Sequence, residues 1–204
     1  MDEARTIETM ESPWAGDGSP FAVSWQKLMM WVFIVTDALL FAGFLSVYGF
    51  VRLASPQWPD QSEVFHLGMI GVMTFILISS SATMATAVAA ARRAHHTRVL
   101  QFLLLTILGG VAFLGMQAFE WTSLIHEGAR LYANPWGPPT FSASFFVITG
   151  FHGSHVLTGV ILLAIVALRS TMGRSSAEGV ELVGLYWHFV DLVWVFIFTL
   201  FYLV

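Results

Sequence analysis

Five long apolar stretches constrain this chain more than any other feature of its sequence. A helix needs about 20 apolar residues to cross about 30 Å of hydrocarbon. A membrane β-barrel would instead alternate apolar and polar residues over about ten positions. The sequence therefore predicts an all-α integral membrane protein, a bundle of five transmembrane helices at about 25–52, 64–91, 98–125, 141–169 and 181–204.

The composition supports this fold and narrows the function classes. Of the 204 residues, 56% are hydrophobic and only 11% are charged, whereas soluble domains carry about 25% charged residues. The net charge of −4 offers no basic surface for nucleic acid. Because the sequence contains no cysteine, thiolate-bound copper, iron–sulfur clusters and covalent c-type haem are excluded.

The distribution of basic residues predicts how the bundle is oriented. Residues 1–24 are polar and acidic, so we expect a flexible cytoplasmic tail followed by the five-helix domain at 25–204. With the N-terminus in the cytoplasm, seven of the nine Lys and Arg residues lie on that side, and only Arg52 and Arg130 lie on the other. Lys and Arg accumulate in cytoplasmic loops, so we expect the N-terminus inside and the C-terminus outside.

Several ionisable side chains lie within the predicted spans or at their edges. A carboxylate at the bilayer centre costs about 2.5–3.5 kcal/mol on insertion scales, so such groups usually face other helices and pair with one another. We therefore expect a buried polar network made of Asp37, Glu120, His152, His155, Glu181, His188 and Asp191.

The spacing of these residues suggests which of them share a helix face. The segment TGFHGSHVLTG, residues 149–159, places His152 and His155 three positions apart. His188 and Asp191 have the same spacing. Residues three apart on a helix are neighbours, so His188 and Asp191 can pair locally.

Three interpretations of the network remain open at this point. Two histidines three apart can ligate a metal or haem, although neither pair is joined by a second pair at a clearly matching depth. Buried carboxylates and imidazoles can also relay protons. The third interpretation, which we favour, is a structural network that fixes helix packing, holds lipid head groups and influences protons in a neighbouring protein.

Four segments resemble one protein family, in the family's order along the chain. VTDALLFAGF (35–44), LGMQAFEWTSLI (114–125), TGFHGSHVLTG and YWHFVDLVWVFIFTLFY (186–202) are together similar to subunit III of haem-copper oxygen reductases. The similarity covers most of the chain after residue 24. The five predicted spans correspond to the short form of this subunit, which lacks the first two of seven helices.

The resemblance implies a non-catalytic subunit of a proton-pumping terminal oxidase that reduces oxygen to water in aerobic respiration. It implies no catalytic residue, metal or other cofactor in this chain, and haems and copper in partner subunits. The implied partners are subunit I as the main contact, subunit II and membrane lipids, with subunit IV and a respiratory supercomplex left open. The implied location is the bacterial cytoplasmic (inner) membrane, with multiple passes and a periplasmic C-terminus. The electron donor, cytochrome c or quinol, stays open.

The family pattern also implies roles for individual residues. His152 and His155 would belong to buried polar packing rather than to haem ligation, and the subunit would support proton uptake by its neighbour. Bound phospholipid is implied as well, and by position we expect Lys27, His155 and Arg169 to contact its head group. Asp37 departs from the glutamate that many members carry, although aspartate also occurs in short quinol-oxidase-type members.

Three alternative functions predict different observations. An accessory subunit of a nitric oxide reductase system would share the five-helix pattern and differ in the gas that its complex consumes. A free-standing membrane transporter predicts flux in liposomes that contain this chain alone. A haem-carrying redox protein predicts a Soret band in the isolated polypeptide.

Overall fold

The fold consists of long helices joined by short connections. The computed structural model describes residues 23–174 and 176–203, so the predicted tail lies almost entirely outside the described residues. Within them, five helices are long and apolar enough to cross a membrane, which confirms the predicted fold class. These helices are α1 (Trp25–Ala54), α3 (Leu67–Arg92), α4 (His96–His126), α5 (Pro139–Thr171) and α6 (Ala177–Ile197), which continues into the π-helical segment η2 (Phe198–Leu203).

A short helix, α2 (Gln61–Val64), separates α1 from α3 and is not foreseen from the apolar pattern. The side chain of Asp60 caps α2, because its Oδ1 accepts hydrogen bonds from the Ser62 hydroxyl at 2.7 Å and the Ser62 N–H at 2.9 Å. These hydrogen bonds lower the pKa of the Asp60 carboxyl. The predicted second span, 64–91, thus covers the end of α2, a break at residues 65–66 and most of α3.

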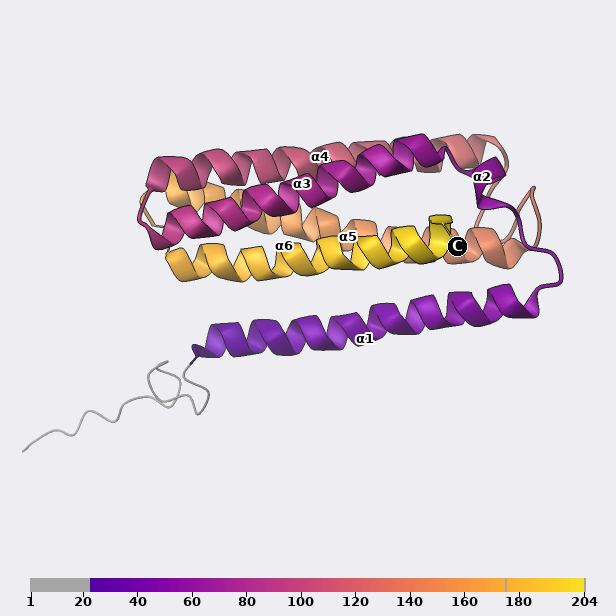
Figure 1. The fold of residues 1–204 in the computed structure, drawn as a ribbon, viewed down its shortest axis with the longest axis horizontal. Helices are drawn as coiled ribbons and strands as arrows, with labels where there is room; N and C mark the ends of the chain where they lie inside the picture. The colour runs from indigo at the N-terminus through magenta and orange to yellow at the C-terminus, as the bar shows by residue number, and fades with distance from the viewer. Residues whose placement is uncertain (1–22, 175, 204) are drawn as a thin grey trace, which may run out of the picture.

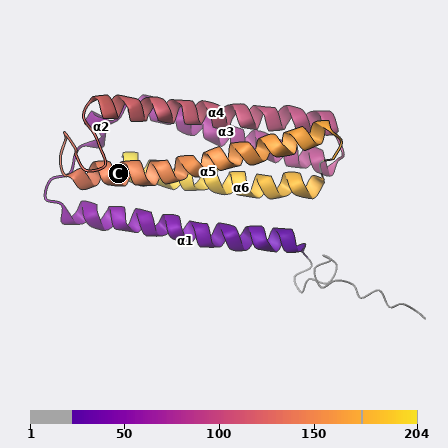
Figure 2. The ribbon, with the colours of Figure 1, turned by 180° about the vertical axis from the view of Figure 1, so that it is seen from behind.

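Four of the long helices form a bundle, and α1 lies along one side of it (Figures 1 and 2). Around the bundle α3 contacts α4, α4 contacts α5, α5 contacts α6, and α6 contacts α3, while α1 rests on α5 and α6. Of the residues of α1, only Asp37, Phe41 and Tyr48 are buried. Helix α1 is therefore held to the bundle by few residues, and one of them is a carboxylate.

Aromatic side chains of α6 fill the centre of the bundle. Trp187 is fully buried, and its indole N–H donates a 3.0 Å hydrogen bond to Oγ of Ser80 on α3. The ring fits because two neighbours lack side chains. A Cβ on Gly110 would lie 2.6 Å from the ring, and one on Gly159 would lie 2.8 Å from it. Small residues thus set the distance at which α4 and α5 approach α6.

The two ends of the bundle differ in charge. One end holds the start of α1, the α3–α4 turn and the α5–α6 loop (Figure 1), and we call it the basic end. Arg52 and Arg130 lie at the opposite end. The side of the membrane that each end faces stays a prediction. The basic end carries Lys27, Arg92, Arg93, Arg98, Arg169 and Arg174.

Candidate functional site

A buried acid–imidazole contact joins α1 to α5. Oδ2 of Asp37 lies 3.2 Å from Nε2 of His155, which is within ion-pair distance. Nδ1 of His155 lies 2.8 Å from the carbonyl of Phe151, which can only accept a hydrogen bond. This carbonyl places a proton on Nδ1. The contact between Nε2 and Oδ2 then accommodates one further proton, carried by either partner.

Aromatic rings pack against this contact. The centroid of the Phe41 ring lies 5.3 Å from that of His155, and the centroid of Phe151 lies 4.6 Å from it. Phe41 is only 3% exposed, and Asp37 is 8% exposed. Burial of this kind favours a pair whose two members together carry no net charge.

His152, on the same helix as His155, makes its polar contact with α6, although its ring also lies 6.4 Å from that of Phe41 on α1. It is fully buried, and its Nε2 lies 3.2 Å from the carbonyl of Val190 on α6, so Nε2 carries the proton. Its ring packs against Phe113 and Trp194, with centroids 5.7 Å and 5.1 Å away. Two histidines three positions apart therefore serve two different helix contacts, α5 with α6 and α5 with α1.

Glu120 lies near the opposite end of the bundle and bonds to the end of the chain. The hydroxyl of Tyr202, in η2, donates a 3.2 Å hydrogen bond to Oε2 of Glu120. Oε1 has no hydrogen-bond partner among the described residues. Both side chains are buried, so this bond fastens the last turn of the chain to α4.

His188 and Asp191 do not pair with each other, contrary to what their spacing allows. Nδ1 of His188 lies 2.6 Å from Oγ of Ser81 on α3. Ser81 also lies beside Asp191, but no hydrogen bond of normal geometry reaches either carboxylate oxygen within the described part of the chain. Asp191 is 5% exposed and is the least satisfied member of the predicted network.

Glu181 belongs to an ionic cluster at the basic end rather than to the membrane interior. One of its oxygens, Oε1, lies 3.1 Å from Nζ of Lys27 on α1 and 3.1 Å from Nη2 of Arg92 on α3. Next to it, the hydroxyl of Ser24, the N-cap of α1, donates a hydrogen bond to Glu178. These contacts fasten the start of α1 to α3 and α6.

The three residues that we expect to contact a lipid head group differ in whether they already have an acidic partner. Lys27 is paired with Glu181, and His155 is in contact with Asp37. Arg169 is exposed in the last turn of α5, and no ion pair to its guanidinium is found among the described residues. Of the three, Arg169 alone presents a cation without an acidic partner in the described part of the chain.

The structure adds polar contacts that were not predicted. The amide of Gln117 on α4 donates a 2.6 Å hydrogen bond to the carbonyl of Thr149 on α5. The indole of Trp121 donates a 3.1 Å bond to the hydroxyl of the same threonine. Trp194 on α6 donates a 3.0 Å bond to Thr74 on α3. A glutamine within an apolar run is a signal that sequence reading could have used, whereas the indole contacts depend on tertiary packing.

No metal centre is found among the described residues, since no group of three or more His, Cys, Asp or Glu side chains there could hold an ion. The members of the network are distributed over separate helix contacts and do not converge on one point. Their arrangement suits cross-helix fastening and local proton exchange.

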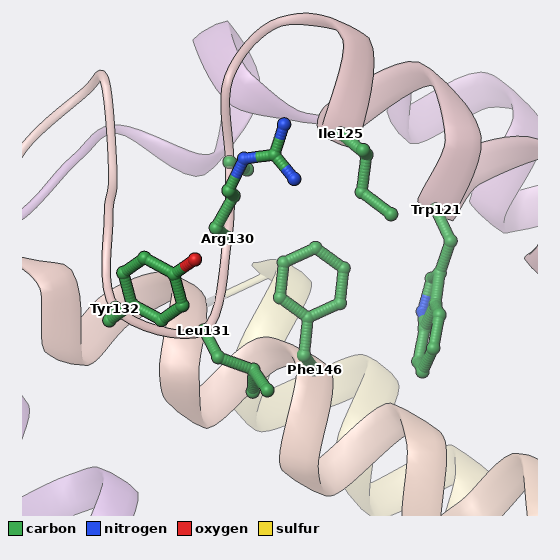
Figure 3. Close-up of a pocket in the computed structure, with 7 residues that line it drawn as sticks. Trp121, Ile125, Arg130, Leu131, Tyr132 and Phe146 are labelled. Carbon is green, nitrogen blue, oxygen red and sulfur yellow. The ribbon is translucent and has the colours of Figure 1, made fainter.

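A cavity at the opposite end lies apart from this network. It has a volume of about 360 Å³ and lies between the end of α4, the start of α5 and the loop that joins them (Figure 3). Trp121, Phe146 and Leu131 form apolar walls, and Arg130 is the charged residue among those that line it. The cavity carries no pair of groups suited to acid–base chemistry.

Comparison with known proteins connects this architecture to one family. Residues 5–204 match the family described as cytochrome c oxidase subunit III. The chain is 33% identical over 183 residues to the "Probable quinol oxidase subunit 3" of Staphylococcus saprophyticus, covering 87% of this chain and 88% of the relative.

Two further relatives are similar over comparable lengths. The chain is 32% identical over 202 residues to the "Cytochrome c oxidase subunit 3" of Thermostichus vulcanus, covering 97% and 96% of the two chains. It is 33% identical over 178 residues to the "Cytochrome bo(3) ubiquinol oxidase subunit 3" of Pseudomonas aeruginosa, covering 85% and 82%. With the five-span fold, these matches show that the protein belongs to the cytochrome c oxidase subunit III family, as a subunit III of a haem-copper oxidase.

Proposed function

We propose that this subunit III acts as a non-catalytic support of a proton-pumping terminal oxidase that reduces oxygen to water. Its tasks are to stabilise the catalytic subunit, to hold phospholipid and to sustain proton uptake by that neighbour during turnover. This proposal rests on the contacts that the polar groups inside the predicted spans make with other helices. His152, His155, His188 and Glu120 each contact another helix or η2.

This use of polar groups supports a scaffold more than a conducting path. A proton relay needs groups within hydrogen-bond reach of one another, directly or through water. Here each contact joins a different pair of elements, and the contact of Asp37 with His155 is enclosed by Phe41 and Phe151. Such a contact can exchange a proton between its two members, but it is not linked to the other polar groups of the network.

As a subunit of an oxidase complex, the chain associates with other oxidase subunits. We propose subunit I as the main contact, with haems and copper in the partner subunits, and subunit II in the same complex. Subunit IV and a respiratory supercomplex are further candidates. We place the complex in the bacterial cytoplasmic membrane, with the basic end of the bundle in the cytoplasm, because Lys and Arg accumulate on that side.

The electron donor belongs to the complex rather than to this chain. Relatives at similar identity are named after cytochrome c and after quinol, so family membership is compatible with either donor. For lipid, the exposed Arg169 is the best placed of the three predicted ligands. Lys27 and His155 already have acidic partners, so each would have to bind a head group in addition to that partner.

Removal of this subunit from the purified oxidase complex tests the proposal. We expect the initial rate of oxygen consumption and the haem content to stay near those of the complete complex, with activity then decaying faster during turnover and with lower proton uptake. Unchanged endurance and unchanged proton uptake would contradict the supporting role.

The same preparation separates the alternatives. Nitric oxide consumption in place of oxygen consumption would favour a nitric oxide reductase system. Proton or solute flux in liposomes that contain this chain alone would favour a transporter. A Soret band in the isolated polypeptide would favour a haem protein.

A further inference from the structure

Helices α3 and α4 enclose two hollows on one face of the bundle. The hollow at the basic end has a volume of about 290 Å³ and is lined by Thr86, Ala89, Ala90, Arg93, Arg98 and Phe102 among others. The second has a volume of about 330 Å³ and lies deeper along the same two helices, with Phe75, Ser79, Thr83, Leu105, Leu108 and Gly109 in its lining. Figure 1 shows α3 and α4 side by side over this length.

The two hollows follow one continuous helix face. On α3 the lining residues Ser79, Thr83, Thr86 and Ala90 succeed one another at spacings of three and four, which keeps them on one side of a helix. From Ala90 to Ser79 the helix rises about 16 Å at 1.5 Å per residue. This length is about half of the roughly 30 Å hydrocarbon core, the depth of one leaflet. We call the combined feature the α3–α4 groove.

The floor of this groove is apolar despite its hydroxyl-bearing residues. The hydroxyl of Thr86 donates a 2.9 Å hydrogen bond to the carbonyl of Ala82 in the preceding turn. The hydroxyl of Thr83 donates a 2.8 Å bond to the carbonyl of Ser80 and lies 2.8 Å from the hydroxyl of Thr106. With the hydroxyls of Thr83 and Thr86 engaged within the protein, the deeper part of the groove suits a hydrocarbon chain. The polar side chains of His95 and Gln101 lie with the two arginines in the hollow at the basic end.

The entrance of the groove is positively charged. Arg93 and Arg98 are exposed, and no ion pair or hydrogen bond to either guanidinium is found in the described residues. Arg92 differs, because it pairs with Glu181. The first turn of α4 contains no acidic residue. Two exposed guanidinium groups at the mouth of a largely apolar groove match the charge and shape of an anionic head group that carries a hydrocarbon chain.

We propose that the α3–α4 groove binds one anionic glycerophospholipid, with its phosphodiester on Arg93 and Arg98 and one acyl chain along Thr86, Thr83 and Ser79. Guanidinium groups bind phosphate oxygens through paired, charge-assisted hydrogen bonds. Basic pockets between transmembrane helices suit anionic head groups. This site is separate from the predicted contacts of Lys27, His155 and Arg169. It gives a place to the phospholipid binding proposed above, and it does not depend on the proposed support of proton uptake.

Lipid titration of the purified oxidase complex tests this site. The complex is stripped of lipid in detergent, and bound lipid is counted by native mass spectrometry after addition of phosphatidylglycerol or zwitterionic phosphatidylcholine. We expect R93Q/R98Q to weaken phosphatidylglycerol binding at one site per chain by about tenfold or more, since hydrogen bonds to charged groups are strong. Phosphatidylcholine, whose choline cation offsets the charge of its phosphodiester, should bind the wild type more weakly and lose less affinity in this variant.

Arg174→Gln is the matched control, because Arg174 is an exposed arginine at the same end and outside the groove. It should leave the occupied site intact. Thr86→Trp, at an exposed position in the floor, should displace the lipid while both arginines remain. This variant also covers the case in which R93Q/R98Q fails to assemble.

Equal phosphatidylglycerol binding by the wild type and Thr86→Trp would overturn the proposal. An equal loss in Arg174→Gln would also overturn it, because the effect would then be one of general surface charge. Full competition by inorganic phosphate at equal concentration would overturn the role of the acyl chain. Because the chain has no cysteine, a photo-crosslinker attached to Thr86→Cys reports the occupant directly, and capture of another oxidase subunit instead of the lipid would overturn the assignment.

Discussion

Oδ2 of Asp37 on α1 lies 3.2 Å from Nε2 of His155 on α5, and α3 and α4 separate these two helices in the sequence. Helix α1 has only two other buried residues, Phe41 and Tyr48. The polar contact is therefore one of the few buried contacts of α1, beside the ionic cluster at its start, and it lies where α5 also contributes the aromatic ring of Phe151.

Substitution of Asp37 tests this positioning role. We expect Asp37→Asn to leave assembly and haem content of the complex near normal, because an amide can still donate a hydrogen bond to Nε2 of a neutral His155. We expect Asp37→Leu to lower the free energy of unfolding by about 1–3 kcal/mol, because the partly buried imidazole of His155 then loses its acidic partner. Thermal unfolding and haem absorbance measure both, with Thr36→Val at an exposed neighbouring position as the control. Loss of haem in Asp37→Asn would contradict a purely supporting role.

Asp191 gives a prediction opposite to the one that its spacing to His188 suggests. Local pairing would make Asp191→Leu more harmful than Asp191→Asn. In the structure neither carboxylate oxygen has a hydrogen-bond partner among the described residues, and His188 contacts Ser81 instead. Replacement of an unpaired buried polar group by an apolar one is often neutral or stabilising, so we expect Asp191→Leu to assemble at least as well as Asp191→Asn. Lower yield of the Leu variant, measured side by side, would show that the carboxylate has a needed partner.

Alanine substitutions at two glycines of α4 distinguish the effect of close packing on stability from the effect of helix propensity. Gly110→Ala would place a Cβ 2.6 Å from the ring of Trp187, so we expect a loss of about 1–3 kcal/mol in the free energy of unfolding from overpacking. Gly115→Ala is the matched control, because nothing lies within 4 Å of the Cβ that it would add. Alanine favours a helix by up to about 1 kcal/mol over glycine, so this control should be neutral or stabilising. Similar melting temperatures for the two variants would refute the packing account of Trp187.

The bond between Tyr202 and Glu120 predicts a coupled effect. Tyr202→Phe should lower the free energy of unfolding by about 1–3 kcal/mol, because it removes the 3.2 Å hydrogen bond to a buried carboxyl group. In a Glu120→Leu background, Tyr202→Phe should lower the free energy of unfolding much less, since no carboxyl group is left without a partner. Tyr132→Phe, at a side chain that is 81% exposed, serves as the control. Additive effects of the two changes would rule out the coupling.

Much of the fold follows from local sequence properties. The number of spans and the charged end of the bundle depend on runs of apolar residues and on the positions of Lys and Arg, and both can be read along the chain. The break before α3 is less visible, because Phe65 and Val64 are apolar like the span that follows. The structure shows the reason for the break, since Phe65 turns inward and packs against Phe145 with centroids 5.3 Å apart.

The sequence by itself identified the polar side chains that must be accommodated in the membrane, because their chemistry and depth are properties of one helix at a time. Their partners were decided only by the tertiary structure. Spacing places His152 and His155 on neighbouring faces of α5, but the packing of α1 and α6 directs one ring to Asp37 and the other to the carbonyl of Val190. The physical reason is that a buried polar group can hydrogen-bond only to an atom about 3 Å away. The rotation and order of the helices, which the whole core sets, decide which atoms come that close.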